Sequence, residues 1–278
     1  CWDLLHVDPL NRAAKAENVA LKSIKQGSVT KSPSGQYFTF ISSGDGDESP
    51  DNILLYDAVE RREKRKVAAP AATSAVFFSA DEKAIVAISK EAVTFYDLNL
   101  RKTGEMPVEK TIHRIGDPDQ VPGGIAEDRQ PYWLTATAEP SSQAATLAGI
   151  VEVDEASDQY SLTLFDTAKA RKVSSINLPS RPVTVALGSD TGAVVVAWNH
   201  AESSKCALIS TSNGAILRTF PDNHRPRGFS FDGQRLLMSS FPNDFLYDAR
   251  TWTQIAELKG HSRMVCAYAF DPLGRFVA

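Results

Sequence analysis

Short apolar runs recur along the whole chain, and each is followed by a turn that contains Gly, Asp or Pro. Residues 36–41, 53–56 and 75–78 are typical, because they are rich in the aromatic and β-branched side chains that strands favour. No long stretch places its apolar residues at helical spacing. The hydrophobic pattern therefore predicts an all-β protein.

Several of these runs end in an aromatic residue followed directly by aspartate. The step from Tyr56 to Tyr96 is 40 residues, and a strand-only repeat of about this length is the sequence signature of a β-propeller. We therefore expect one β-propeller domain of four-stranded antiparallel blades. The pairs are Trp2-Asp3, Tyr56-Asp57, Tyr96-Asp97, Phe165-Asp166 and Tyr247-Asp248.

The repeat divides residues 1–278 into units of one blade each. Five units are complete, and the chain begins and ends inside partial ones, which indicates a fragment of a longer protein. If the partial units are halves of one blade, the ring closes with six blades; otherwise an open arc exposes two sheet edges, which favours aggregation. The predicted units are 1–30 (partial), 31–70, 71–110, 111–178, 179–220, 221–258 and 259–278 (partial).

Two units depart from the pattern. In the third, strands are expected at 132–138 and 160–166, with a long excursion through 144–151 between them. The step from Tyr96 to Phe165 is much longer than the preceding one, through either insertions or a hidden extra hairpin. In the fourth unit, Ile209-Ser210 stands where the aromatic-Asp pair is expected.

The end of the chain carries Gly260-His261, an apolar strand and the turn Pro272-Leu273-Gly274 in that order. This stretch resembles the first half of a WD40 repeat, and Trp2-Asp3 resembles the second half of another. The resemblance implies structural roles within a blade for Trp2 and His261. The units are also similar to TolB-like and peptidase-associated propellers.

Composition narrows the classes of function. A net charge of −4 disfavours nucleic-acid binding, which needs a basic surface. Three cysteines form no disulfide framework, and the settings of Cys206 and Cys266 predict buried side chains. No apolar run has the length of a membrane helix and no signal peptide is visible, so we expect a cytoplasmic, monomeric domain.

The chemistry-bearing residue types do not form a recognisable reaction centre. The acidic stretch 45–51 suggests calcium by composition but lacks EF-hand spacing, so a solvated loop is expected. The charged run 61–66 follows a strand end and is expected to be a turn. Neither the elbow of a serine hydrolase, a zinc motif nor a phosphate-binding loop occurs. We expect no catalytic residue, no metal site and no cofactor.

One set of cations suggests a binding surface. Arg181, then Arg225 and Arg227, then Arg263 lie at the entry to the first strand of three successive units. In propellers of this family these loops share one rim, and arginine pairs well with carboxylates. We therefore expect a non-catalytic protein-interaction scaffold whose rim binds a protein or peptide. The alternative is a propeller attached to a peptidase, hydrolase or kinase, where it regulates substrate access.

Overall fold

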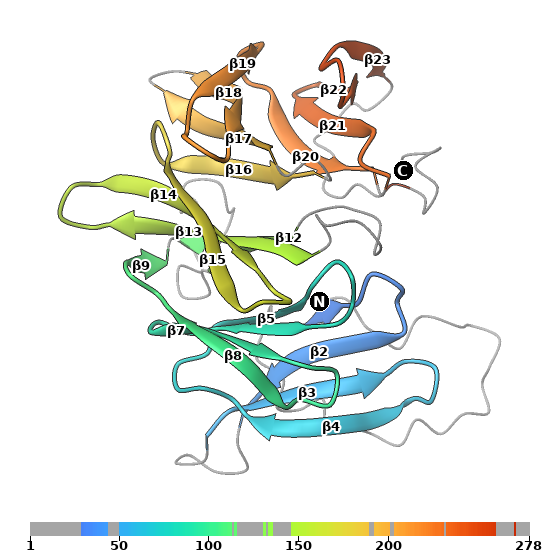
Figure 1. Ribbon diagram of the computed structural model, residues 1–278. Coiled ribbons are helices and arrows are strands. Elements are labelled where there is room, and N and C mark those ends of the chain that lie inside the picture. Colours follow the sequence, from blue (N-terminus) through green and yellow to red (C-terminus); the bar gives the residue numbers. More distant parts are fainter. Residues whose placement is uncertain are drawn as a thin grey trace.

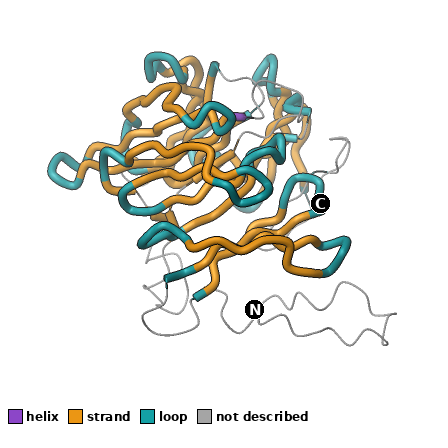
Figure 2. Tube along the Cα trace, turned by 60° about the horizontal axis from the view of Figure 1, so that its bottom comes forward, coloured by secondary structure: helices purple, strands orange, loops and turns teal. Residues whose placement is uncertain are grey.

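The computed structural model describes residues 29–43, 50–112, 114–115, 130–131, 133–135, 146–188, 192–200, 203–230, 232–259 and 270. Nearly all of their regular structure is β-strand, arranged in successive antiparallel sheets (Figure 1). Strands and connecting loops account for almost all of the described residues in Figure 2. The predicted all-β propeller of four-stranded blades is thereby confirmed. Within the described residues, no helix has the length and hydropathy needed to cross a membrane.

The first two sheets each follow the simple order of the chain. Sheet one contains β1 (Thr30–Lys31), β2 (Tyr37–Ser42), β3 (Asn52–Asp57) and β4 (Arg62–Ala68). Sheet two contains β5 (Ala75–Phe78), β6 (Ile85–Ile88), β7 (Ala92–Tyr96) and β8 (Lys102–Pro107).

The third sheet carries additional short strands. Its main path is β12 (Trp133–Thr135), β13 (Leu147–Asp154), β14 (Gln159–Asp166) and β15 (Arg171–Asn177), and β9 (Thr111–Ile112) also pairs with β13. A separate two-stranded pair is formed by β10 (Arg114–Ile115) and β11 (Gln130–Pro131).

The last two sheets repeat the order of the first two. Sheet four contains β16 (Pro182–Leu187), β17 (Ala193–His200), β18 (Ser203–Ser210) and β19 (Ile216–Phe220). Sheet five contains β20 (Arg225–Phe229), β21 (Arg235–Ser240), β22 (Asn243–Asp248) and β23 (Gln254–Leu258).

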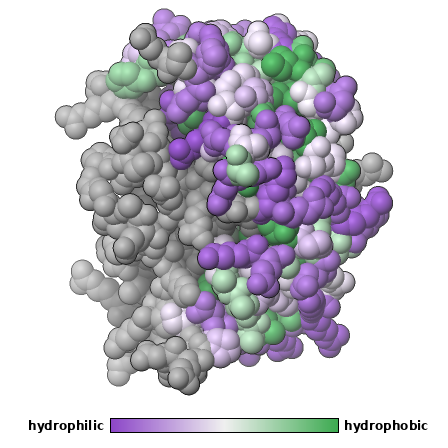
Figure 3. Space-filling model, turned by 90° about the vertical axis from the view of Figure 1, so that its left-hand side faces the viewer, coloured by the Kyte–Doolittle hydropathy of each residue, from purple (hydrophilic) through white to green (hydrophobic). Residues whose placement is uncertain are grey.

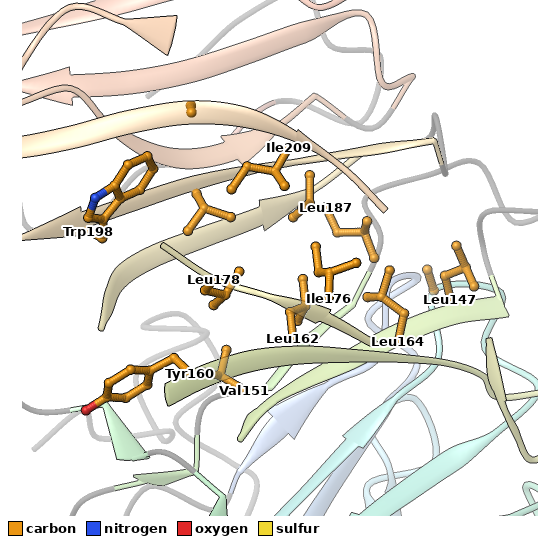
Figure 4. Packing of buried hydrophobic residues seen from close by; sticks show 14 residues of the cluster. Leu147, Val151, Tyr160, Leu162, Leu164, Ile176, Leu178, Leu187, Trp198 and Ile209 are labelled. Atoms are coloured by element: carbon orange, nitrogen blue, oxygen red, sulfur yellow. The ribbon is translucent and has the colours of Figure 1, made fainter. Parts of the chain in front are cut away.

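The hydrophobic core lies between neighbouring sheets rather than at one centre. Separate clusters of buried side chains join sheets one and two, two and three, three and four, and four and five. Figure 4 shows the third of these, where Leu162 and Ile176 of sheet three lie close to Leu187 and Ile209 of sheet four. Because a middle strand is covered on both faces, its sequence is a continuous apolar run, as β6 illustrates.

In the described sheets, the aspartate of each aromatic-Asp pair closes the turn between the third and fourth strands. In sheet five, Asp248 Oδ1 accepts the backbone N–H groups of Arg250 at 2.9 Å and Thr251 at 2.8 Å. The recurring pair is therefore a turn-forming device, which explains its regular spacing. The equivalent acceptors in the first three sheets are Asp57, Asp97 and Asp166.

Sheet four achieves the same turn with a serine. Ser210 Oγ accepts the backbone N–H of Ser212 at 3.3 Å, and Gly214 ends the turn with a φ of 73°. In the other four sheets the turn contains a non-glycine residue with positive φ, at Arg61, Leu100, Ala170 and Trp252. A bulge in the third-to-fourth strand pairing follows in all five sheets. The loss of the aromatic-Asp pair in this unit therefore leaves the hairpin intact.

The structure resolves two questions about the order of strands. Residues 147–154, expected to be part of an excursion, form β13, the second strand of sheet three. The extra length lies earlier, where β10 and β11 pair as a small additional hairpin. The division into units stays a prediction, since the partial units lie almost wholly outside the described residues. Closure of the ring by these two units also stays a prediction.

Only Arg61 of the charged run at 61–66 belongs to a turn, so the expectation of a turn was wrong for the other five residues. Residues 62–66 belong to β4, the edge strand of sheet one. An edge strand is covered less than a middle strand, so β4 needs no apolar run and was hidden from the hydrophobic pattern. The face shown in Figure 3 is likewise largely hydrophilic over the described residues, with scattered hydrophobic side chains.

Candidate functional site

Two of the four predicted binding arginines lie within a strand rather than in a loop. Arg225 is the first residue of β20 and Arg227 the third, whereas Arg181 directly precedes β16. The strands β16 and β20 pack against each other, which brings the ends of sheets four and five together (Figure 1). Arg263 lies outside the described residues, as do Trp2 and His261.

Arg225 and Arg227 lie at the end of sheet five where the chain passes from β21 to β22, and Arg181 lies at the start of β16 in sheet four. Arg225 pairs in register with Ser239, near the end of β21, and Phe241 follows in the adjoining turn. We call Arg181, Arg225, Arg227 and Phe241 the arginine rim.

The loop that leads into β20 is tied firmly to sheet four. Asn223 donates its backbone N–H to Ser204 O at 2.7 Å, and Asn223 Oδ1 accepts the backbone N–H of Ser204 at 2.9 Å. Arg225 Nη2 donates to Ser204 Oγ at 3.1 Å. Lys205 Nζ lies 2.6 Å from Asp222 Oδ2, and this hydrogen bond lowers the pKa of Asp222. The base of the rim is thus fixed across two sheets.

In sheet five the rim carries an exposed cation and an exposed aromatic ring. Arg227 is exposed, and its Nε donates to Ser239 Oγ at 2.7 Å. The side chain of Phe241 is 73% exposed, although phenylalanine is normally buried. Arginine and aromatic residues are enriched at the energetic centres of protein interfaces. This arrangement can bind an acidic side chain and an apolar one together.

A buried histidine lies directly beneath the rim. His224 is 6% exposed and its ring packs against Phe245 with centroids 4.7 Å apart. Its Nδ1 lies 3.3 Å from Asp222 O, whereas Nε2 is buried without a hydrogen-bond partner. Burial lowers the pKa of His224, so the ring is neutral at pH 7.

A pocket of about 350 Å³ lies between the first two sheets. Glu105 in its wall is already bonded to Lys102 at 2.5 Å, which lowers the pKa of the Glu105 carboxyl. The lining holds no histidine, cysteine or lysine that would pair with Ser89 for nucleophilic catalysis. We assign this pocket no reaction. It is lined by Pro70, Ala71, Ser89, Glu91, Ala92, Glu105 and Pro107.

In the described part of the chain, no group of three or more His, Cys, Asp or Glu side chains is placed to bind a metal ion. The acidic stretch 45–51 lies mostly outside that part. Phe241 was missed by sequence analysis, although the Phe241-Pro242-Asn243 sequence is a turn signal that could have placed the ring at a strand end.

The comparisons support the fold but name no family. No family model matches the chain, and no curated protein matches it. Among solved structures, it is similar to Kuenenia stuttgartiensis hydrazine synthase with a TM-score of 0.55 and 14% identity, over 90% of this chain and 71% of that one. At this identity the likeness shows a shared fold and nothing of activity.

Proposed function

We propose that the chain is a non-catalytic interaction scaffold, a WD40-like propeller that presents its rim to a protein or peptide partner. The observation that carries the proposal is that Arg227 and Phe241 are both exposed at one end of sheet five. Ser239 holds Arg227 by its hydroxyl, and Phe241 follows Ser239 by two positions. Arginine and aromatic side chains are the residue types enriched at the energetic centres of protein interfaces.

The partner segment that fits this rim is acidic with an apolar residue nearby. A carboxylate pairs with the guanidinium of Arg227 through charge-assisted hydrogen bonds, and Arg181 supplies a second exposed cation. An apolar side chain covers Phe241. Arg225 has a different part, since its bond to Ser204 keeps the loop before β20 in place.

The test compares partner capture by the wild type and by a variant with Arg181→Glu, Arg227→Glu and Phe241→Ala. The control is Arg250→Glu, which reverses an exposed charge at the opposite end of sheet five. We expect the rim variant to lose the partner that the wild type and control retain, measured by quantitative pull-down and then by calorimetry. Equal capture by all three proteins would remove the rim from the proposal.

A second candidate is a propeller that serves an attached enzyme, and the similar solved structure is itself named for an enzyme. In that arrangement the rim faces a catalytic domain of the same protein. The two candidates separate in one experiment: an interaction scaffold captures its partner in trans, whereas a regulatory propeller alters turnover by the attached domain when the rim is changed.

A further inference from the structure

The edge strand β4 concentrates positive charge on an acidic protein. It contains Arg62, Lys64, Arg65 and Lys66, whereas β8, β15 and β19 carry two cations at most and β23 carries none. All five strands are the last in their sheets. Charged side chains discourage an edge from pairing with other chains, and β4 carries more cations than the other four edge strands.

A bulge gathers three of the four cations of β4 on one face, whereas Lys66, opposite Leu54, projects from the other face. Arg65 lies opposite Leu55, and Leu55 belongs to the core that faces sheet two, so Arg65 projects from that face. Lys64 is the extra residue of the bulge between Leu55 and Tyr56. Its Nζ lies 4.4 Å from the centroid of the Tyr37 ring, which packs on the same core. Lys64 therefore projects toward sheet two as well.

The strand register also gives the faces from which Arg62 and Glu63 project. Arg62 lies opposite Asp57, two positions from Leu55, and so shares the face of Arg65. Glu63 lies opposite Tyr56 and points to the other face. Without the bulge, the consecutive residues Lys64 and Arg65 would project from opposite faces of the strand. With it, three cations share one face that contains no acidic residue of β4.

Arg62 and Arg65 on this face are only lightly engaged, whereas Lys64 is half-buried and donates from Nζ to Tyr37 Oη at 3.0 Å. Arg62 pairs with Glu60 at 2.7 Å, but both side chains are more than half exposed, so this surface pair contributes little. Arg65 is exposed and its Nη1 donates to the backbone carbonyl of Lys64 at 3.1 Å. The outer edge of β4 pairs with no strand among the described residues.

We propose that β4 is a docking site for an extended acidic segment of a protein partner, which adds to the sheet as a further antiparallel or parallel strand. Backbone hydrogen bonds at the open edge give affinity, and carboxylates on alternate residues meet Arg62, Lys64 and Arg65. Arg62 and Arg65 lie opposite residues two positions apart on β3, a spacing of about 6.8 Å that matches alternate Asp or Glu. The same charges repel a second copy of β4.

A protein segment suits the site better than a nucleic acid. The net charge of −4 opposes a polyphosphate over most of the surface. Glu60 and Glu63 flank the cations and would repel a continuous phosphate backbone, whereas a peptide places its carboxylates only where the bases lie. A nucleic acid also offers no pairing for the strand edge.

The test uses a fluorescein-labelled decapeptide of alternating Glu and Thr, followed by fluorescence anisotropy. We expect wild-type binding that weakens as salt rises, and a loss of about tenfold or more in Arg62→Glu/Arg65→Glu. Arg62→Lys/Arg65→Lys keeps most of the affinity. The matched control is Arg171→Glu, which occupies in β15 the register position of Arg62 in β4. The rim change Arg227→Glu has no effect, which separates this site from the proposed function.

Two further probes decide the mode of binding. The same peptide with alternate backbone amides N-methylated should lose binding, because it cannot extend the sheet. Equal binding of the methylated peptide would overturn strand addition, and equal binding by Arg62→Glu/Arg65→Glu would overturn the site. A labelled oligo-dT that binds while the acidic peptide does not would replace the proposal with a nucleic-acid surface. Circular dichroism confirms that each variant is folded.

Discussion

The ring of Phe95 in sheet two meets the ring of Phe165 in sheet three edge to face, with centroids 5.6 Å apart and planes at 76°. Both side chains have no exposed surface. They lie in the cluster that joins the two sheets, so they contribute to the contact between blades as well as to each blade's own packing.

Replacing Phe95 by alanine should therefore weaken the packing between sheets two and three as well as the packing within sheet two. We expect Phe95→Ala to lower the free energy of unfolding by about 3–5 kcal/mol, and Phe95→Leu by less, because leucine leaves a smaller cavity. Urea denaturation followed by fluorescence measures both. Val173→Ala serves as the control, since Val173 is 52% exposed. A Phe95→Ala variant as stable as this control would show that the sheets are not coupled through the ring pair.

The turn aspartates predict a specific response to acid. Hydrogen bonds from the backbone of Thr251 and Arg250 hold the pKa of Asp248 below its ordinary value. Their stabilisation is present above about pH 4, the pKa of an unfolded aspartate, and is lost as the pH falls through the lower pKa of the folded state. We expect Asp248→Ala to lower Tm at pH 7 and to lose less stability between pH 4 and pH 2 than the wild type.

The control for that change is Glu155→Gln, which removes an exposed carboxylate from a different turn. It should leave Tm and its acid dependence close to those of the wild type. If both variants behave alike, the effect of Asp248 is one of net charge and not of the turn.

Sequence pattern predicted the middle strands well because their chemistry is local. Residues 85–88 and 93–96 are covered on both faces, so their apolar runs are unambiguous, and an Asp turn follows the second of them. The pattern failed at β4 and at β13 for opposite reasons. In β4 the exposed faces carry charged residues, so its sequence resembles that of a turn. In β13 alanine and glycine weaken the strand signal, although the strand is almost wholly buried.

The candidate site was predictable only in part. Arg181, Arg225 and Arg227 could be found from their places in successive units, but their partners could not. The bonds of Arg225 to Ser204 and of Arg227 to Ser239 depend on how sheets pair, which no local motif encodes. The bulge that gathers Lys64 and Arg65 on one face is likewise a property of strand register.

The prediction that Cys206 is buried is confirmed, since its side chain is 2% exposed. Burial raises the pKa of the Cys206 thiol to about 12. Because the thiolate is the reactive form, we expect iodoacetamide at pH 8 to leave Cys206 unmodified in the folded protein and to alkylate it in denaturant. Peptide mass spectrometry reads this residue separately from Cys1 and Cys266. Rapid labelling of Cys206 without denaturant would show that sheets four and five separate readily.

His224 links the stability of the arginine rim to pH. The ring lies between the loop before β20 and the side chains of Phe245 and Tyr247. The backbone oxygen of Asp222 lies within hydrogen-bond distance of His224 Nδ1, and the Asp222 carboxylate is paired with Lys205. The residue that follows His224 in the sequence is the cation Arg225. The carboxylate of Asp222 is therefore not available to stabilise an imidazolium at this position.

Because burial lowers the pKa of His224, the unfolded chain binds a proton at its ordinary pKa of about 6.5 while the folded protein does not. Stability should be fully present above that pH and should decrease as the pH falls from about 6.5 toward 5. We expect His224→Phe, which keeps an aromatic ring on Phe245, to remove most of this decrease, and His200→Gln, at an exposed position, to leave it intact. Urea unfolding at several pH values measures the slope. An unchanged slope in His224→Phe would mean that another group carries the acid sensitivity.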